Sequence, residues 1–259
     1  MISIASLIYR SPAYADSVYE SLHRFTPHLH DGRARFFFVA NDPSAGLLQH
    51  LKVKSYPHVV QINTPRSQRW MNSHGFGRPT YLRSVYLGWN RAIEESEEIA
   101  VLVNSDMMFS PRWLDNLLHY AGKNRYVVSH LAEPTQTYIA RNSKAYAWEC
   151  GTGAENFNEE LFLTRWREHE NRPTRAWTRT RPGGEFQPCA FYRDTVLGLG
   201  GFPHGNVWDL TQRKIISGDM WFMQKFLAAG GVHMTVMDSV VYHYKEREMR
   251  DESVNRQLC

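Results

Sequence analysis

Strand-like and helix-like segments alternate through the first half of the chain, and this alternation is the strongest constraint on its fold. Apolar runs predict strands at 2–9, 34–40, 58–63 and 99–104. Apolar residues spaced three and four apart predict helices at 13–25, 45–53, 79–97 and 111–121. Such a chain builds βαβ units, and thus a mostly parallel sheet with helices on its faces. We therefore expect an α/β fold with ligands at the carboxyl ends of its strands.

The second half is less regular. Its pattern predicts strands at 126–131, 186–193, 232–237 and 239–244, and helices at 159–170, 194–202 and 217–231. Two arginine-containing segments, 64–78 and 171–188, are expected to be loops. A chain of 259 residues without an internal repeat or a linker fits one domain. We expect two halves within this domain, a regular one at 1–122 and a more irregular one at 123–259.

Composition limits the class of protein and its compartment. The formal net charge is +4, and 23 of the 30 basic residues are arginine, the better partner for phosphates. No apolar segment approaches the roughly 20 residues that span a bilayer. The N-terminal run reads as a first strand rather than as a signal peptide. The three cysteines, Cys150, Cys189 and Cys259, form no C-x-x-C pair, so we expect free thiols and a cytoplasmic protein.

Polar residues follow two of the predicted strands directly. Asn41 and Asp42 follow the strand at 34–40, and the strand at 99–104 leads into Ser105 and Asp106. An unpaired buried carboxylate costs several kcal/mol, so Asp106 needs a cation, a donor or water. It could simply cap the next helix, but Ser110 is better placed to cap a helix that begins at 111. A hard metal ion between Asp106 and a diphosphate would also explain the placement.

Two further candidates have ordinary alternatives. Asp219 lies in the first turn of the helix predicted at 217–231, where a carboxylate often only stabilises the helix N-terminus. His243 lies in the last predicted strand, where a histidine is more often a core or surface residue than a ligand. A neutral imidazole is nonetheless a suitable ligand for a divalent transition ion.

The order and spacing of these motifs resemble an inverting family 2 glycosyltransferase with the nucleotide-diphospho-sugar (GT-A) fold. The resemblance covers about 1–120 and 186–245. "WNRAIEES" is similar to an Asn-x-Gly-Ile helix element, with Asn90 and Ile93 matching, and "VLVNSDMMFSP" is similar to the Asp-x-Asp metal motif, with Asn104 at the first Asp. "SGDMWF" resembles the Glu-Asp helix start, with Gly218 in place of Glu, and "VVYHY" resembles the strand whose histidine completes the metal site.

The resemblance implies a hexosyltransferase-type reaction with a nucleotide sugar, expected to be a UDP-sugar. Asp106 and His243 would hold Mn²⁺ or Mg²⁺ on the donor diphosphate, and Asp219 would be the catalytic base in an inverting displacement. The other residues expected to contact the donor are Asn41, Asp42, Arg66, Arg69, Arg78, Asn90 and Ser105. A solvated basic loop is an equal alternative for the three arginines.

An arginine- and tryptophan-rich segment lies within an expected insertion at 155–185. Arginine interleaved with aromatic residues suits a polyanion whose bases or sugars can stack. The expected acceptor-binding residues are Arg175, Trp177, Arg179, Arg181 and Trp221. A nucleic acid such as hydroxymethylated DNA, an anionic glycan or a phosphorylated lipid would satisfy the same charge. A mobile acceptor loop whose arginines lie on its solvent-exposed face is an equal alternative.

Two other classes of protein are possible. In the first, the arginine- and tryptophan-rich segment makes the chain a nucleic-acid-binding protein on a degenerate sugar-nucleotide fold. The second is a sugar-phosphate nucleotidyltransferase, which shares the α/β layout. That class normally has a glycine-rich basic loop after its first strand, and "YRSPAY" contains no glycine.

Overall fold

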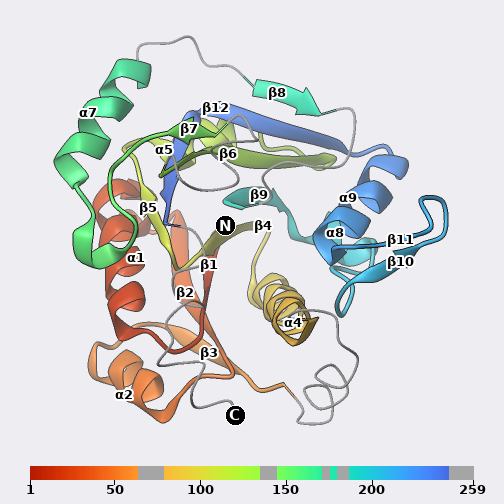
Figure 1. Ribbon diagram of the computed structural model, residues 1–259, viewed down its shortest axis with the longest axis horizontal. Helices are drawn as coiled ribbons and strands as arrows, with labels where there is room; N and C mark the ends of the chain where they lie inside the picture. Colours follow the sequence, from red (N-terminus) through yellow and green to blue (C-terminus); the bar gives the residue numbers. More distant parts are fainter. Residues whose placement is uncertain (64–78, 135–144, 171–175, 180–186, 245–259) are drawn as a thin grey trace.

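The structure is a computed structural model that describes residues 1–63, 79–134, 145–170, 176–179 and 187–244. The first half confirms the expected alternation. Its elements are β1 (Ile2–Ile8), α1 (Pro12–Phe25), β2 (Ala34–Asn41), α2 (Ala45–Val53), β3 (His58–Gln61), α4 (Pro79–Glu95) and β4 (Ile99–Asn104). The four strands pair in parallel in the order β3-β2-β1-β4 (Figure 1).

The second half continues the same sheet. Its larger elements are β5 (Met107–Phe109), α5 (Trp113–His119), β6 (Arg125–Glu133), α7 (Glu159–Glu170), β9 (Cys189–Tyr192), α8 (Arg193–Gly198), α9 (Gly218–Ala228) and β12 (Val232–His243). Short strands β7 (Tyr146–Ala147) and β8 (Ala176–Arg179) pair with β6 and β12. A separate hairpin consists of β10 (Val207–Asp209) and β11 (Lys214–Ile216).

The order along the sheet is β3-β2-β1-β4-β9-β6-β12-β5. β9 is antiparallel to both of its neighbours, β4 and β6, and β12 is parallel to β6. β4, β6 and β12 therefore point the same way as β1, β2 and β3. The sheet is mixed, because β5, β8 and β9 run against these six strands, but the six carboxyl ends share one edge.

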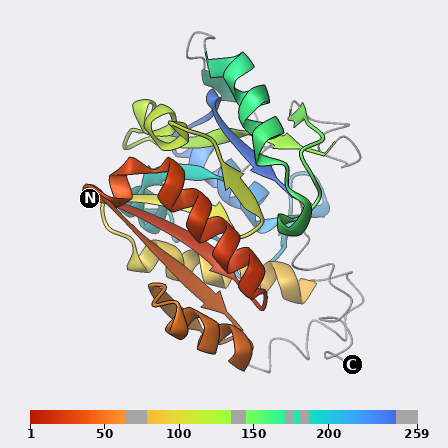
Figure 2. The ribbon, with the colours of Figure 1, turned by 90° about the vertical axis from the view of Figure 1, so that its left-hand side faces the viewer.

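Helices cover both faces of the sheet, as successive residues of β1 illustrate. Ile4 and Ile8 belong to a core that they share with buried residues of α1, α2, α5 and α7. Ala5 and Leu7 point to the opposite face, into a core with α4, α8 and α9. Figure 2 shows α1 and α2 together on the first of these faces. The fold is thus the three-layer α/β arrangement that the alternating pattern predicts.

Several local expectations are wrong. Residues 232–243 form one strand with an irregularity between Val236 and Val240, rather than two strands. Ser110 does not cap a helix at 111: its hydroxyl donates to the carbonyl of Val240 (2.7 Å), and α5 begins at Trp113, after Arg112 in a left-handed conformation. The expected loop at 171–188 contains β8. The β10–β11 hairpin was not predicted, because its strands are only three residues long.

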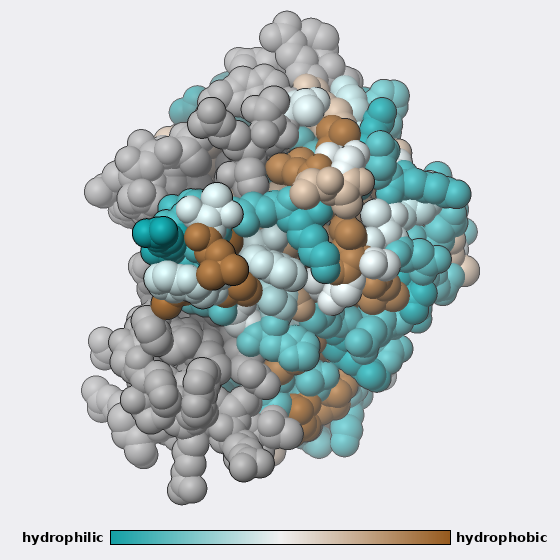
Figure 3. All heavy atoms as spheres, turned by 90° about the vertical axis from the view of Figure 1, so that its right-hand side faces the viewer, coloured by the Kyte–Doolittle hydropathy of each residue, from teal (hydrophilic) through white to brown (hydrophobic). Residues whose placement is uncertain are grey.

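Other features concern the surface and the thiols. Cys150 and Cys189 are free, as expected, and both are buried; Cys259 lies outside the described residues. In the part of the chain that the structure describes, no helix combines the length and apolar character needed to cross a bilayer. The β10–β11 hairpin exposes Trp208 and Leu210 (56% and 82%). Figure 3 shows the side of the molecule on which this hairpin lies, where brown apolar groups stand among teal hydrophilic ones.

Candidate functional site

The carboxyl ends of β2 and β4 lie at one level of the sheet, on either side of β1. Ala40 pairs with Ile8, and Leu7 pairs with Asn104. The polar residues that follow these two strands are therefore two strand spacings, roughly 10 Å, apart at the same edge. This edge is where an open α/β sheet binds ligands, and it carries both acidic turns that the sequence singled out.

Asp106 and His243 meet at this edge. His243 pairs with Met107 across β12 and β5, and the amide of Tyr244 donates to the carbonyl of Asp106 (3.0 Å). Nε2 of His243 lies 3.3 Å from Oδ2 of Asp106. Both residues are buried, with exposed fractions of 8% and 7%. Pairing of β5 with β12 thus brings together two residues that are far apart in the sequence.

Glu133 completes this arrangement from the end of β6. Its Oε1 lies 2.9 Å from Nδ1 of His243, and the side chain is fully buried. Burial lowers the pKa of His243, but the two carboxylates raise it more, to about 10 in the absence of a metal. One imidazole edge therefore faces Asp106 and the other faces Glu133.

The geometry of Asp106 and His243 is compatible with two ligands of one metal ion. Adjacent ligands of an octahedral Mg²⁺ or Mn²⁺ ion lie about 3 Å apart, close to the separation found here. A ligating histidine usually donates its other N–H to a carboxylate, which is the relation between Nδ1 and Glu133. The described residues contain no group of three or more His, Cys, Asp or Glu side chains arranged to hold a metal. Oxygens of a diphosphate and water would therefore have to complete the coordination.

Asn41 and Asp42 belong to a hydrogen-bond network that joins β2, β3 and α4. Asn41 is fully buried, and its Nδ2 donates to the carbonyl of Ser84 (2.8 Å). Nδ2 of Asn63 lies within hydrogen-bond distance of Oδ1 of Asn41 (3.1 Å), Oδ2 of Asp42 (2.5 Å) and Oγ of Ser84 (2.7 Å). Asn41 is thus held inside the protein, whereas Asp42 is partly exposed.

Asp219 lies in the first turn of α9, as expected. The helix ends at Ala228 and β12 begins at Val232, so α9 runs back along the sheet and its first turn lies toward the carboxyl edge. Ser217 is the N-cap residue, but its side chain caps nothing. Oδ1 of Asp219 instead accepts from the amide of Met220 (2.8 Å) and from the hydroxyl of Tyr86 (3.3 Å).

Tyr86 fills the space beside Asp219. Burial, followed by the charge of Asp219, raises the pKa of the Tyr86 phenol, which therefore remains a donor. A Cβ on Gly218 would lie 2.6 Å from the Tyr86 ring and 2.8 Å from the carbonyl oxygen of Gly205. The packing therefore excludes the glutamate that the family resemblance would place at 218.

Asn90 holds the turn of Gly200, Gly201 and Phe202, which follows α8. Its Nδ2 donates to the carbonyl of Phe202, and its Oδ1 accepts from the amide of Phe202, both at 2.8 Å. Gly201 has φ +68°, and a Cβ there would meet the Asn90 side chain at 2.6 Å. Both polar groups of the Asn90 amide thus bind the protein itself; a contact with the donor stays a prediction.

Helix α4 connects these parts. Ser84 and Gly88 are four residues apart, so they share one side of the helix, and they face Asn41. Tyr86 and Asn90 share the opposite side and face Asp219 and Phe202. One helix therefore fixes the Asn41–Asp42 network on one side and the Asp219 turn on the other.

The remaining expected residues are only partly described. Trp221 is half-buried on α9, with Nζ of Lys225 5.3 Å from its ring centroid. Trp177 and Arg179 lie on β8, whose backbone pairs antiparallel with β12. Ser105 is buried between β4 and β5. The expected residues outside the described part of the chain are Arg66, Arg69, Arg78, Arg175 and Arg181.

The sequence analysis did not identify Glu133, Asn63 or Tyr86. Glu133 lies two residues beyond the strand expected at 126–131, and an acidic residue at such a strand end was an available signal. Asn63 ended an expected strand and showed no partner in the sequence. Tyr86 belonged to the apolar stripe of its helix, so its hydroxyl function could be seen only in three dimensions.

No protein-family model matches the chain, and no curated protein matches it in sequence. Solved structures do resemble it. GalNAc-T7 with UDP, GalNAc and Mn²⁺ has a TM-score of 0.58 at 12% identity, over 94% of this chain and 43% of that one. Mannosyltransferase PcManGT from Pyrobaculum calidifontis, in complex with GDP-Man and Mn²⁺, has a TM-score of 0.54 at 14% identity, over 98% and 59%.

A third similar structure is S. aureus TarS 1–349, with a TM-score of 0.55 at 12% identity over 96% of this chain and 61% of that one. The chain thus spans between 43% and 61% of the length of these three proteins. At such low identity the likeness concerns the fold. The strand order, the helical layers and these neighbours together show that the chain has the GT-A fold of nucleotide-sugar glycosyltransferases.

Proposed function

We propose that this protein is a metal-dependent glycosyltransferase that moves a hexose from a nucleotide-diphospho-sugar to an acceptor hydroxyl. The observation that carries the proposal is the Asp106–His243 pair, supported by Glu133, at the carboxyl edge of a GT-A sheet. The neighbours with UDP or GDP-Man and Mn²⁺ support a nucleotide sugar and a divalent metal. A UDP-sugar is the expected donor, and 1–259 is proposed to act as one domain.

Asp106 and His243 would hold the metal, Mn²⁺ or Mg²⁺. When bound, it supplies positive charge that stabilises the leaving nucleoside diphosphate. Glu133 would fix the tautomer and orientation of His243, leaving Nε2 to face the metal. Because Asn104 replaces an acid, Asp106 is the sole carboxylate of this motif.

Asp219 is the proposed base of an inverting reaction. It would take the proton of the acceptor hydroxyl while the acceptor oxygen bonds to the anomeric carbon from the face opposite the leaving group. The bond between the anomeric carbon and the diphosphate oxygen breaks, and the nucleoside diphosphate carries away that electron pair. Tyr86 holds Oδ1 of Asp219, so the carboxylate enters the reaction in a fixed orientation. Such an inverting displacement is the reaction that the resemblance to family 2 glycosyltransferases implies.

The donor would lie along the edge from Asp42 to Asp106. Asp42 is proposed to face the ribose or the base, while Asn41 and Asn90 shape the site from within the protein. Ser105 precedes the metal-binding Asp106 in the same turn and is proposed to contact the diphosphate. Contacts from Arg66, Arg69 and Arg78 to the pyrophosphate remain predictions.

The acceptor is proposed to be a polyanion bound by Arg175, Trp177, Arg179, Arg181 and Trp221. Hydroxymethylated DNA, an anionic glycan and a phosphorylated lipid are the three candidates. Measuring DNA affinity over a series of salt concentrations tests the first candidate. A variant that neutralises fewer phosphates should show a weaker dependence of DNA affinity on salt. If replacing Arg175, Arg179 and Arg181 together leaves this dependence unchanged, the segment does not bind DNA.

Calorimetry with UDP, with and without Mn²⁺, tests the central proposal. We expect UDP binding that requires the metal in the wild-type protein and is lost in Asp106→Ala. A screen of nucleotide sugars for slow hydrolysis would then identify the donor. UDP or GDP binding that is absent, or that is the same in Asp106→Ala, would remove the metal assignment.

A further inference from the structure

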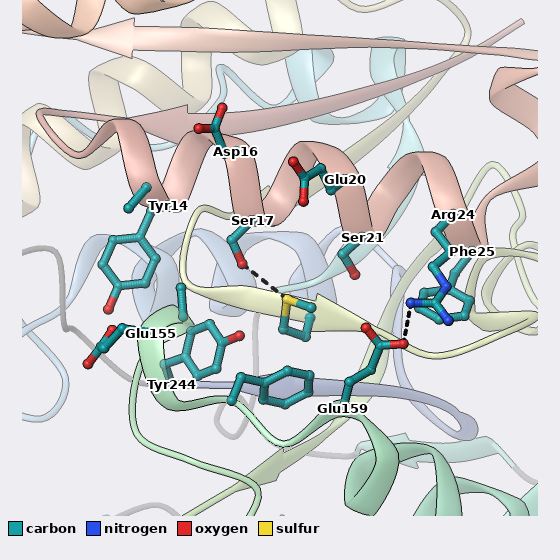
Figure 4. Close-up of a pocket in the computed structure, with 14 residues that line it drawn as sticks. Tyr14, Asp16, Ser17, Glu20, Ser21, Arg24, Phe25, Glu155, Glu159 and Tyr244 are labelled. Atoms are coloured by element: carbon teal, nitrogen blue, oxygen red, sulfur yellow. Dashed lines mark hydrogen bonds and ion pairs between the residues drawn. The ribbon is translucent and has the colours of Figure 1, made fainter.

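A cavity lies on the face of the sheet that α1 covers. It has a volume of about 610 Å³, with α1 as one wall and the segment 154–159 as the other. Its floor is formed by Met108 of β5 and by Tyr244, just after β12. Figure 4 shows Tyr244 between the two walls. A cavity of roughly 300–1,000 Å³ is the usual size of a small-molecule site.

This cavity is distinct from the donor edge. Successive residues of a strand point to opposite faces, so Tyr244 and His243 diverge. Tyr244 packs in the core beneath α1, with its ring 6.1 Å from that of Tyr14. The donor edge and the cavity thus share the β5–β12 pair but open on different sides of it, and a ligand in the cavity is not the nucleotide sugar.

The walls carry four carboxylates, of which two have hydrogen-bond or ion-pair partners. Asp16 accepts from His50 (2.8 Å) and Tyr56 (3.0 Å). Glu159 forms an ion pair with Arg24 across the cavity, drawn as a dashed line in Figure 4. This pair ties the two walls together beside Phe25.

Glu20 and Glu155 form no ion pair within the described residues, and they lie on opposite walls. Both are exposed at the rim, where single ion pairs are weak. Glu20 and Glu155 nevertheless place negative charge on both walls, which repels anions and attracts a molecule with more than one positive charge.

The floor contains a polar group without a partner. Tyr244 is 3% exposed, and its hydroxyl has no hydrogen-bond partner in the described part of the chain, although Ser17 lies nearby. The Ser17 hydroxyl donates to the weak acceptor Sδ of Met108 (3.2 Å). Burial raises the pKa of Tyr244, with Glu155 among the further causes, so the phenol is neutral and able to accept a hydrogen bond.

We propose that this cavity binds a small organic polycation of the polyamine class. Ammonium groups would pair with Glu20 and Glu155, one on each wall, and donate to the buried Tyr244 oxygen. The aromatic rings of Tyr14, Phe157 and Tyr244 suit both the methylene carbons and the positive charge of such a ligand. The proposal does not depend on the proposed transferase activity.

Titration calorimetry of the full chain with spermidine, without metal or nucleotide and at low salt, tests this proposal. We expect saturable binding to one site, weakened about tenfold by Glu20→Gln combined with Glu155→Gln. The control combines Asp194→Asn with Glu168→Gln, which removes the same charge from exposed residues outside the cavity. Equal affinity of the two double variants would overturn the proposal.

Two further measurements sharpen the result. Tyr244→Phe should keep the thermal stability, because the lost hydroxyl has no partner, yet bind spermidine several-fold more weakly. Unchanged spermidine affinity in this variant would refute the role of the floor. Spermidine binding by Asp106→Ala should match the wild type, which separates this site from the metal. If MgCl₂ instead binds and displaces spermidine only in proteins with Glu20 and Glu155, the site takes inorganic cations and the polyamine assignment is wrong.

Discussion

Oε1 of Glu133 lies 2.9 Å from Nδ1 of His243, and the glutamate is fully buried at the end of β6. A buried carboxylate needs a partner, and here that partner is an imidazole whose other nitrogen faces Asp106. The contact joins β6 to β12 and fixes the direction in which Nε2 points. The contact that links the two strands would therefore also orient the histidine of the proposed metal site.

Glu133→Gln should weaken Mn²⁺ binding by about 10- to 100-fold, the usual effect of removing a carboxylate behind a ligating histidine. The loss of bound Mn²⁺ is read directly by electron paramagnetic resonance of the free ion, without any turnover. Circular dichroism establishes that the variant is folded. Glu149→Gln is the matched control, because Glu149 is exposed. Wild-type Mn²⁺ affinity in Glu133→Gln would show that the glutamate does not support the metal.

Asp219→Asn should bind UDP and Mn²⁺ normally and lose sugar transfer, because the amide cannot take the acceptor proton. Tyr86→Phe should transfer more slowly but keep an intact base, since it removes only the hydrogen bond to Oδ1. The transfer rates of the two variants check both expectations. Near-normal turnover by Asp219→Asn would refute its role as base.

Gly218→Ala should destabilise the protein by about 1–3 kcal/mol, because an added methyl group overlaps the Tyr86 ring and backbone of the Gly205 turn. Gly198→Ala is the control: a Cβ there meets nothing within 4 Å. Urea denaturation of the two variants measures the difference. Equal stability would mean that the first turn of α9 shifts freely, and that the packing does not explain the missing glutamate.

The two buried thiols predict how cysteine reactivity and protein stability depend on pH. Burial raises the pKa of Cys150 to about 11 and that of Cys189 to about 12. Both should therefore resist iodoacetamide at pH 8 in the native protein and react in urea, as measured by mass spectrometry. Because the unfolded thiols ionise at a lower pH than the folded ones, their contribution to stability is full below about pH 8.5 and falls as the pH rises further. Rapid labelling of either thiol in the native protein would contradict this burial.

The sequence predicts those elements whose own residues determine them. β1, β2 and β4 are apolar runs buried on both faces, and α4 has a continuous apolar stripe, so local pattern and tertiary environment agree. β5 is different, because Met107–Phe109 becomes a strand only by pairing with β12. The left-handed Arg112 and the delayed start of α5 also depend on tertiary packing.

The residues of the candidate site also fall into those that local sequence predicts and those that tertiary contacts define. Asp106, Asp219 and His243 follow from their positions at element ends, but Glu133 and Tyr86 are defined by partners about 110 and 133 residues away. Contacts that close loops of this length cannot be identified from local sequence, although an acidic residue at a strand end was a signal for Glu133 itself. The acidic cavity along α1 likewise appears only when the segment 154–159 is placed opposite that helix.

Asn90→Ala should destabilise the protein by about 2–4 kcal/mol, since it removes both 2.8 Å hydrogen bonds to Phe202 and leaves two backbone groups without these partners. Asn90→Asp is the informative companion, because it keeps the acceptor for the Phe202 amide but cannot donate to its carbonyl. We therefore expect an intermediate stability in urea denaturation at neutral pH. If the alanine variant were as stable as the wild type and only nucleotide binding fell, Asn90 would be a donor-contacting residue, as the family resemblance suggests. The relative loss of stability and of UDP affinity thus decides between the two roles.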